Sequence, residues 1–173
     1  MIATRQSWSN LQSLPVQRSL LSLQREFTEQ EYACICEGLI PRSMEDKWFM
    51  FIEEDTLYIH RSWTGYCIYQ ISFIQRDAMY SVDEAFVNRD PNQYVGVDDQ
   101  YDEKLLMFLI ESLLLGGHSS LPLAAHVPAG IATELHLHHV VGAGHQEKEM
   151  SMELSILGGL KWLWQWLLWL IKN

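Results

Sequence analysis

Basic residues are scarce in this chain. Its 173 residues include 12 Lys and Arg against 22 Asp and Glu, which gives a formal net charge of -10. No run of Lys or Arg supplies a local positive patch, and a phosphate backbone repels a protein of this charge. The composition therefore predicts that the protein has no nucleic-acid partner.

Cysteine is also scarce, with only Cys34, Cys36 and Cys67. An odd number and a Cys-x-Cys spacing in a helix-like stretch disfavour a disulfide or a metal clasp, since positions i and i+2 point to different sides. Such residues are typical of buried thiols in a reducing compartment. The N-terminal stretch lacks a continuous apolar segment before a cleavage site, so we expect no secretory signal and a cytoplasmic location.

Motifs of common enzyme classes are missing. There is no Gly-x-Ser-x-Gly elbow, no Gly-x-x-x-x-Gly-Lys-Ser/Thr loop and no Cys-x-x-Cys pair. Acid pairs occur at 45–46, 53–55 and 98–99, but a strand start, a turn and a helix cap explain them without acid-base chemistry. We expect no cofactor, and we favour a protein that is not an enzyme.

What the sequence does contain is a hydrophobic core, because 48% of the residues are hydrophobic. The stretch 27–42 predicts a helix, with Thr28 and Glu31 in capping-box spacing and Gly38 at its end. Residues 47–62 alternate around the acidic turn at 53–55, which predicts two antiparallel strands.

A Thr64-Gly65 turn leads into a third strand over 66–75. If the meander has four strands rather than three, residues 78–90 form the fourth, at the edge of the sheet. A helix is predicted between Asp98 or Asp99 and Gly116-Gly117. Its apolar stripe should pack on the sheet and comprises Tyr101, Leu105, Phe108, Leu109 and Leu113.

These elements predict an α+β fold, in which an antiparallel meander of three or four strands packs against helices. We expect an N-terminal arm over residues 1–26 and the α+β domain over 27–146. Residues 147–173 are expected to form a linker and a hydrophobic, Trp-rich C-terminal helix.

The hairpin corner His-Arg-Ser-Trp-Thr-Gly is the first candidate site. His60, Arg61, Ser62 and Trp63 are predicted to bind a ligand there, because a guanidinium beside an indole suits an anion, a carboxylate or a stacked ring. In the structural alternative, Trp63 only staples the corner, and Arg61 pairs with acids of the adjacent strand or of Asp98-Asp99.

A second candidate is the cluster Glu134, His136 and His138, which could offer two ligands to zinc or a similar ion. Nothing in the sequence fixes a third ligand. The alternative is a solvated polar face with one or two hydrogen-bonded histidines.

The C-terminal stretch 154–171 is apolar and contains Trp162, Trp164, Trp166 and Trp169. At about 1.5 Å per residue it falls just short of a comfortable membrane span as a helix. It could attach to or insert into a membrane, form an assembly interface, or complete the core of the domain.

Residues 41–73, 87–116 and 138–144 resemble a family of small bacterial proteins that share an Asp-Lys-Trp strand, the His-Arg-Ser-Trp-Thr-Gly turn and an Asn-Arg-Asp-Pro segment. The resemblance covers roughly residues 27–144. That family has no established activity, so the resemblance implies a compact domain and carries over no mechanism.

The preferred functional hypothesis is a non-enzymatic interaction or sensor module. It would recognise a protein partner or a small anionic ligand through Arg61 and Trp63, while the C-terminal helix mediates membrane attachment or self-association. One alternative is a metal-assisted enzyme that uses Glu134, His136 and His138. Another is a small membrane-acting effector that works through its C-terminal helix, and the location would then be peripheral or tail-anchored at the membrane.

Overall fold

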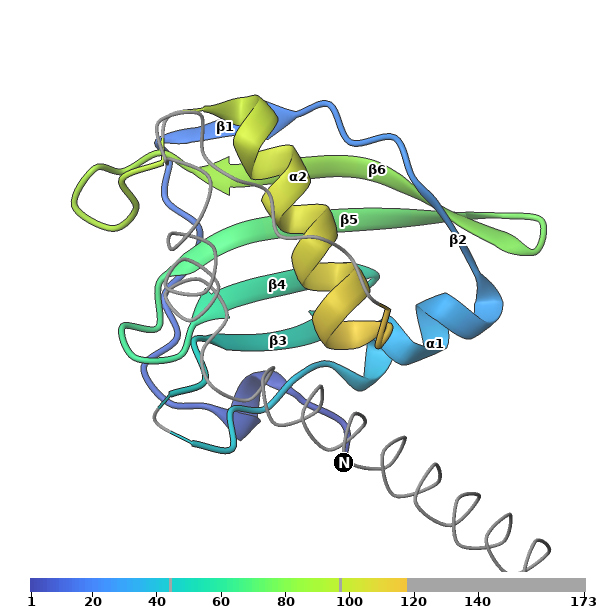
Figure 1. Ribbon diagram of the computed structural model, residues 1–173, viewed down its shortest axis with the longest axis horizontal. Coiled ribbons are helices and arrows are strands. Elements are labelled where there is room, and N and C mark those ends of the chain that lie inside the picture. The colour runs from blue at the N-terminus through green and yellow to red at the C-terminus, as the bar shows by residue number, and fades with distance from the viewer. Residues whose placement is uncertain (44, 97, 118–173) are drawn as a thin grey trace, which may run out of the picture.

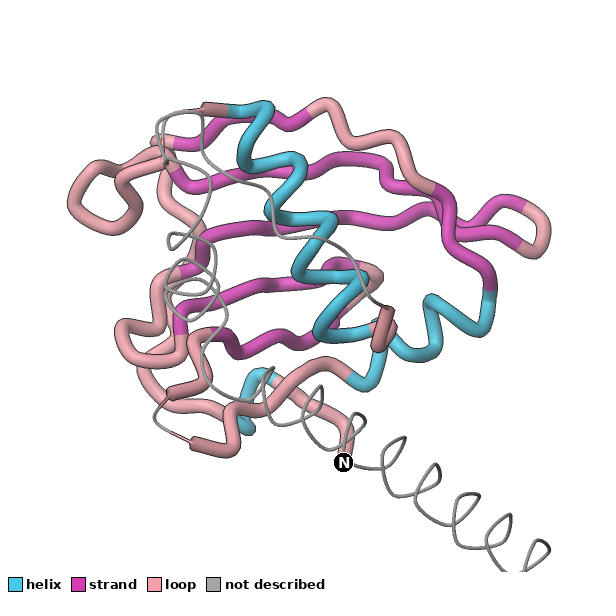
Figure 2. The backbone as a smooth tube through the Cα atoms, in the orientation of Figure 1, coloured by secondary structure: helices cyan, strands magenta, loops and turns pink. Residues whose placement is uncertain are grey.

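The computed structural model describes residues 1–43, 45–96 and 98–117. This part of the chain forms a six-stranded antiparallel sheet with two α-helices, which confirms the α+β class (Figure 1 and Figure 2). The elements in chain order are η1 (Arg5–Ser7), β1 (Arg18–Leu21), β2 (Glu26–Thr28), α1 (Glu29–Glu37), β3 (Trp48–Glu53), β4 (Thr56–Arg61), β5 (Cys67–Arg76), β6 (Met79–Asn88), α2 (Asp99–Leu109) and the π-helical turn η2 (Ile110–Leu114).

The sheet has the order β1-β6-β5-β4-β3, and β2 pairs with β6 as well. Strands β3 to β6 form the predicted meander. The prediction that the fourth strand lies at the edge is wrong, because the N-terminal segment returns to pair with it: Arg18 lies opposite Asn88 and Glu26 opposite Ser81. Pro91 lies beyond the end of β6 and occupies no position in its ladder.

Both helices begin as the sequence predicts. The backbone N–H of Glu31 donates to Thr28 Oγ1 at 3.2 Å, and the backbone N–H of Thr28 donates to Glu31 Oε2 at 2.8 Å, which completes the capping box. Asp98 caps α2 by accepting from the backbone N–H groups of Gln100 and Tyr101.

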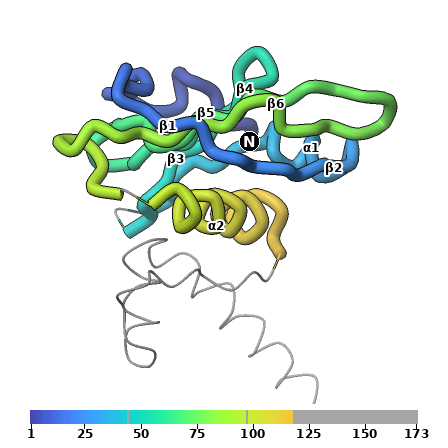
Figure 3. The backbone as a smooth tube through the Cα atoms, turned by 90° about the horizontal axis from the view of Figure 1, so that it is seen from above, coloured from blue at the N-terminus to red at the C-terminus, as the bar shows by residue number. Residues whose placement is uncertain are grey.

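One face of the sheet is covered by α2, which crosses the strands (Figure 1, and from above in Figure 3). Leu105, Leu106 and Leu109 of the helix are at most 3% exposed and pack against buried side chains of the strands. Burying a leucine of this kind contributes about 1.5–3 kcal/mol, so this interface is the main core.

The opposite face is covered by residues 1–17, the first part of the predicted arm (Figure 3). The Trp8 ring stacks on Phe49 with 5.7 Å between centroids, and Ala3, Phe49 and Phe51 form a second buried cluster. An antiparallel sheet can leave one face to water, but apolar Phe49 and Phe51 need a cover on this side. Residues 1–26 therefore belong physically to the sheet, and they also supply strand β1.

A β-bulge in the β4–β5 ladder decides which side chains face α2. Ile59 lies opposite Tyr69 while His60 lies opposite Cys67, so Ile68 is the extra residue. Ile68 and Tyr69 both join the core under α2, whereas Cys67 faces the same side as its partner His60. Strict alternation along the third strand, which would put Cys67 and Tyr69 on one face, therefore does not hold.

Candidate functional site

The candidate site is built on the corner that joins β4 to β5. The backbone N–H of Gly65 donates to Arg61 O at 2.8 Å, and that of Arg61 donates to Tyr66 O at 2.9 Å, which closes the turn. Gly65 has φ of +72°, and a Cβ there would lie 2.0 Å from the backbone oxygen of Asn10. Only glycine fits, so the corner and the N-terminal segment are held in contact.

His60 lies on the face covered by the N-terminal segment. It is 2% exposed, and its ring stacks on Phe51 at 5.7 Å. Its Nδ1 is hydrogen-bonded to Gly65 O at 2.9 Å, and burial lowers the pKa of the imidazole. Of the four residues predicted to bind a ligand, His60 is therefore the one that the structure separates from the others.

Ser62 links the corner to the N-terminal residues and to the loop before β3 through three hydrogen bonds. Its Oγ donates to Asp46 O at 2.6 Å, its backbone N–H donates to Lys47 O at 3.0 Å, and its carbonyl accepts from Trp8 Nε1 at 2.8 Å. Two segments that are distant in sequence, at Trp8 and at residues 46–47, therefore converge on one buried serine. The surface around it is shaped before any ligand arrives.

The Arg61 side chain is partly buried on the side of α2. Its guanidinium lies over the Trp48 ring, 4.1 Å from the centroid. Burial lowers the pKa of the guanidinium, an effect that nearby Tyr94 and Tyr69 partly offset. Among the described residues, no carboxylate pairs with Arg61 and no side chain or backbone group is hydrogen-bonded to its guanidinium.

In the structural alternative, Arg61 forms an ion pair with an acid of the adjacent strand or with Asp98 or Asp99. In the structure, these acids have other partners. Asp98 caps α2, and Asp99 forms an ion pair with Arg89. In the adjacent strand β3, Glu53 pairs with Arg5 at 2.6 Å on the other face. Pairing with these acids is therefore wrong as an account of Arg61.

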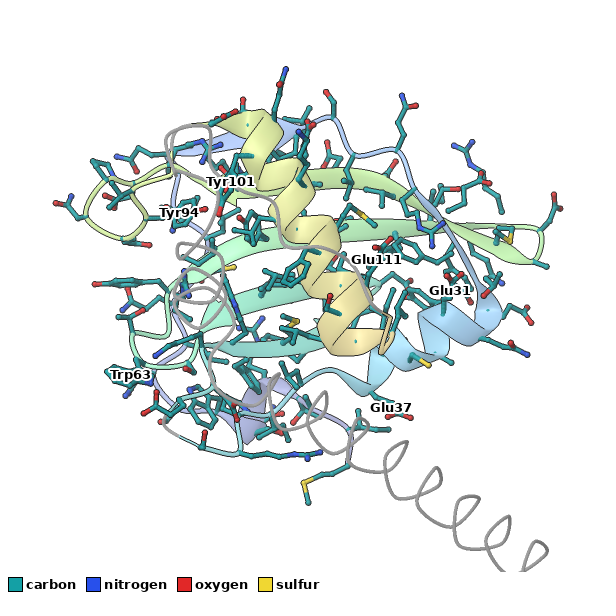
Figure 4. The ribbon with its side chains drawn as sticks, viewed as in Figure 1. Glu31, Glu37, Trp63, Tyr94, Tyr101 and Glu111 are labelled. Atoms are coloured by element: carbon teal, nitrogen blue, oxygen red, sulfur yellow. The ribbon has the colours of Figure 1, made fainter. Side chains whose placement is uncertain are left out.

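Trp63 projects from the end of the sheet and is 64% exposed (Figure 4). The Lys47 ammonium lies over its ring at 4.8 Å. A cleft of about 470 Å³ lies beside it, within the range of small-ligand sites. The residues that line this cleft are Lys47, Arg61, Ser62, Trp63, Thr64, Tyr66, Asn92 and Gln93.

The amide of Gln93 on the cleft wall is held by a buried asparagine. Asn88 is 0% exposed, and its Nδ2 donates both to Cys67 O at 2.8 Å and to Gln93 Oε1 at 2.9 Å. Because the Gln93 oxygen faces Asn88, the amide NH₂ group remains as a donor. The cleft therefore combines two cations, an exposed indole and an oriented amide.

A buried polar network that sequence reasoning missed stands beside Arg61. Asp102 of α2 is 0% exposed, and its Oδ1 accepts from Tyr69 Oη at 2.7 Å and from Tyr94 Oη at 2.5 Å. Its Oδ2 lies 2.7 Å from Arg89 Nη1, and Arg89 also donates to Gly96 O at 3.0 Å. The only signal in the sequence was an acid in the first turn of a helix, which the helix dipole already explains.

The pKa values of the two tyrosines and of Arg89 are raised in this network. Burial raises the pKa of Tyr69 and of Tyr94, and the nearby Asp102 carboxylate adds to both effects. Burial alone would lower the pKa of Arg89, but its hydrogen bonds to Asp99 and Asp102 raise it overall. Through Tyr94, which Figure 4 labels, the network anchors the loop after β6, and this loop supplies Asn92 and Gln93 to the lining of the cleft.

The other predicted site residues lie outside the described part of the chain. These are the metal candidates Glu134, His136 and His138 and the tail residues Trp162, Trp164, Trp166 and Trp169. Within residues 1–43, 45–96 and 98–117, no group of three or more His, Cys, Asp or Glu is placed to hold a metal ion. In the same residues, no helix has the length and apolar character to cross a membrane.

The functional inference depends on the geometry of this corner. It offers a preformed cleft with a guanidinium that stacks on Trp48 and has neither a carboxylate nor a hydrogen-bond acceptor among the described residues. Comparison of the chain with protein-family models, with curated proteins and with solved structures finds no match.

Proposed function

We propose that the protein is a non-enzymatic recognition module that binds an anionic group, carried by a protein partner or a small ligand, in the cleft beside Arg61 and Trp63. The observation that carries the proposal is the guanidinium of Arg61, which is partly buried on Trp48 without a carboxylate or a hydrogen-bond acceptor among the described residues. A desolvated charge without a partner is costly. A carboxylate or phosphate in the cleft would supply that partner, and stacking on the indole leaves the guanidinium edge available for paired hydrogen bonds.

The surroundings of Arg61 favour an anion. Lys47 adds a second positive charge, and the Gln93 amide adds a neutral donor. Among the described residues that line the cleft, none is acidic. The chain as a whole is strongly acidic, so this corner is a local exception to its charge.

Binding is favoured over catalysis by the state of the groups around the cleft. The raised pKa values keep the hydroxyls of Tyr69 and Tyr94 protonated, and both donate to Asp102. His60, the only histidine among the described residues, is buried on the other face. The usual general bases are histidine and carboxylate side chains within hydrogen-bonding distance of the ligand, and no histidine, aspartate or glutamate is among the described lining residues.

The tail extends this proposal on the basis of its sequence alone. Residues 154–171 would form a Trp-rich helix that attaches a cytoplasmic protein to a membrane or assembles it with other copies. Deleting residues 158–173 and fractionating cells tests this part. If the deletion changes neither the oligomeric state of the soluble protein nor its location, this part of the proposal is wrong.

The test of the anion site is an NMR titration of the full chain with sodium phosphate and, separately, with N-acetylglutamate. We expect the Arg61 Nε–H and Trp63 indole N–H signals to shift with saturation in the wild-type protein. Arg61→Gln should abolish the saturable shift of the indole. Arg76→Gln is the matched control, since Arg76 is exposed at the far end of β5.

The two ligands separate carboxylate recognition from phosphate recognition. A saturable shift with either one supports the proposal and identifies the preferred anion. If neither ligand shifts these signals, or if Arg61→Gln titrates like the wild-type protein, the proposal is wrong.

A further inference from the structure

A second cleft lies on the other side of the site, and the proposed anion site does not use it. It has a volume of about 620 Å³. Its described lining comes from the N-terminal segment, the loop before β3 and the corner itself, and consists of Trp8, Pro41, Arg42, Ser43, Ser62 and Trp63. The exposed surface therefore continues past the Arg61 cleft.

The two clefts meet at Ser62 and Trp63, which line both of them. Each cleft is by itself as large as a small-ligand site. An exposed tryptophan between two hollows is typical of an interface, where aromatic anchors carry much of the binding energy. A chain-like ligand can contact Trp63 and fill both hollows at once.

The charge of the combined surface is positive on both sides of Trp63. Arg42 lines one cleft, and Lys47 and Arg61 line the other. No acidic side chain is among the described residues that line either cleft, although the chain carries 22 Asp and Glu. Complementary charge attracts a partner and selects against partners of the same charge.

Hydrogen bonds hold the two clefts in a fixed relation. Trp8 Nε1 donates to Ser62 O, and the backbone N–H groups of Arg42 and Ser43 donate to Asp46 Oδ2 at 2.8 and 3.1 Å. Ser62 Oγ in turn donates to Asp46 O. A preorganised surface loses less conformational entropy when it binds.

We propose that the anionic ligand is an extended acidic peptide segment of a partner protein, with a carboxylate at Arg61 and its neighbouring residues crossing Trp63 into the cleft at Trp8 and Arg42. This inference rests on the proposed function and adds the class of partner to it. A peptide of six residues extends about 20 Å and can place carboxylates on both sides of the indole. A single-stranded nucleic acid would present the same sign of charge to Arg42, Lys47 and Arg61, so the experiment compares it directly with the peptide.

The experiment measures fluorescence anisotropy of a dye-labelled hexaglutamate peptide with the full chain. Hexaglutamine is the neutral peptide control, and a thymidine hexanucleotide is the phosphate control. Unlabelled N-acetylglutamate competes for the Arg61 cleft alone. The variants are Arg61→Gln, Arg42→Gln and Trp63→Ala, and Arg76→Gln is the matched charge control.

We expect hexaglutamate to bind at least about tenfold more tightly than N-acetylglutamate, because the second contact becomes intramolecular. Arg42→Gln should weaken hexaglutamate about threefold and leave N-acetylglutamate unchanged, since an exposed ion pair contributes little. Trp63→Ala should weaken hexaglutamate about tenfold or more. Arg61→Gln should weaken both ligands.

The outcomes separate this inference from the proposed function. Suppose that N-acetylglutamate binds through Arg61, but hexaglutamate binds no more tightly and its affinity is unchanged by Arg42→Gln. The peptide inference is then wrong, and the anion site stands. If hexaglutamine binds as well as hexaglutamate, or the thymidine hexanucleotide binds better, acidic-peptide recognition is wrong. If Arg76→Gln weakens binding as much as Arg42→Gln, the effect is one of net charge and the inference fails.

Discussion

Replacing Asp102 by alanine tests the physical account of how α2 is fixed beside the Arg61 cleft. Asp102 is 0% exposed, accepts hydrogen bonds from two tyrosine hydroxyls and forms an ion pair with one arginine. Removing it leaves the Tyr69 hydroxyl buried without its acceptor, and it takes one of two carboxylates from Arg89. A large loss of stability is expected, because an unsatisfied buried group retains its full desolvation penalty.

The size of the stability loss depends on which interactions the partners of Asp102 retain in the variant. Breaking a buried ion pair by removing one member costs about 3–5 kcal/mol. Arg89 retains Asp99 and Gly96 O, and the hydroxyls of Tyr69 and Tyr94 lie 3.2 Å apart and can bond to each other. We therefore expect Asp102→Ala to lower the free energy of unfolding by about 3 kcal/mol, at the lower end of that range.

Urea and thermal unfolding measure this loss. For a chain of this length, about 3 kcal/mol corresponds to a fall in Tm of about 6–12 °C. Asp99→Ala is the matched control, since its side chain is 53% exposed and pairs with the same arginine. That variant should lose no more than about 1 kcal/mol.

A double-mutant cycle isolates the bond between Asp102 and Tyr69. Tyr69→Phe should cost about 1.5 kcal/mol by itself, as is usual for a hydrogen bond to a charged group. The double variant should lose about 1 kcal/mol less than the two single losses together, because both remove the same bond. A loss below about 1 kcal/mol for Asp102→Ala, or additive single losses, would refute the account of a buried network at this position.

Three further predictions concern the corner and the face covered by residues 1–17. Burial lowers the pKa of His60 in the folded protein, so the unfolded chain binds the proton first as the pH falls below 6.5. The free energy of unfolding therefore decreases as the pH falls. The urea midpoint should fall more between about pH 7 and pH 5 in the wild-type protein than in His60→Gln. Parallel pH profiles of the two proteins would contradict this. Burial raises the pKa of Cys67 to about 12 while Cys34 is exposed, so iodoacetamide should label Cys34 in the native protein and Cys67 only after unfolding, as mass spectrometry would show. Gly65→Ala should destabilise the fold by about 2–4 kcal/mol, because its Cβ would collide with the backbone of Asn10; an unchanged Tm would contradict the close contact between the corner and the N-terminal segment.

Local signals predicted most of the domain. The capping residues Thr28 and Asp98 fixed the starts of both helices, and the turns at 53–55 and Gly65 fixed the meander. These signals act over a few residues, so they are readable without tertiary structure. The number of strands was not predictable in the same way, because β1 is four residues long and gains its place only by pairing with β6.

The site was predicted in part. The sequence placed Arg61 and Trp63 at a corner, and the structure puts both on the wall of one cleft. It could not separate His60 from them, because the bulge that sets the register at β5 leaves no pattern in the sequence. It also missed Asn88 as the residue that orients Gln93, since the contact forms only when the loop after β6 folds back.

The contacts of the N-terminal segment have a consequence for the order of folding. Trp8 bonds to a carbonyl 54 residues further along the chain, and the backbone N–H of Ser22 bonds to Glu103, 81 residues away. During synthesis, residues 1–22 emerge before the elements from β3 onward that they contact, and contacts of such separation form slowly. Until that segment docks, Phe49 and Phe51 remain open to other chains, so the interval between synthesis and docking is when this protein is most prone to aggregate.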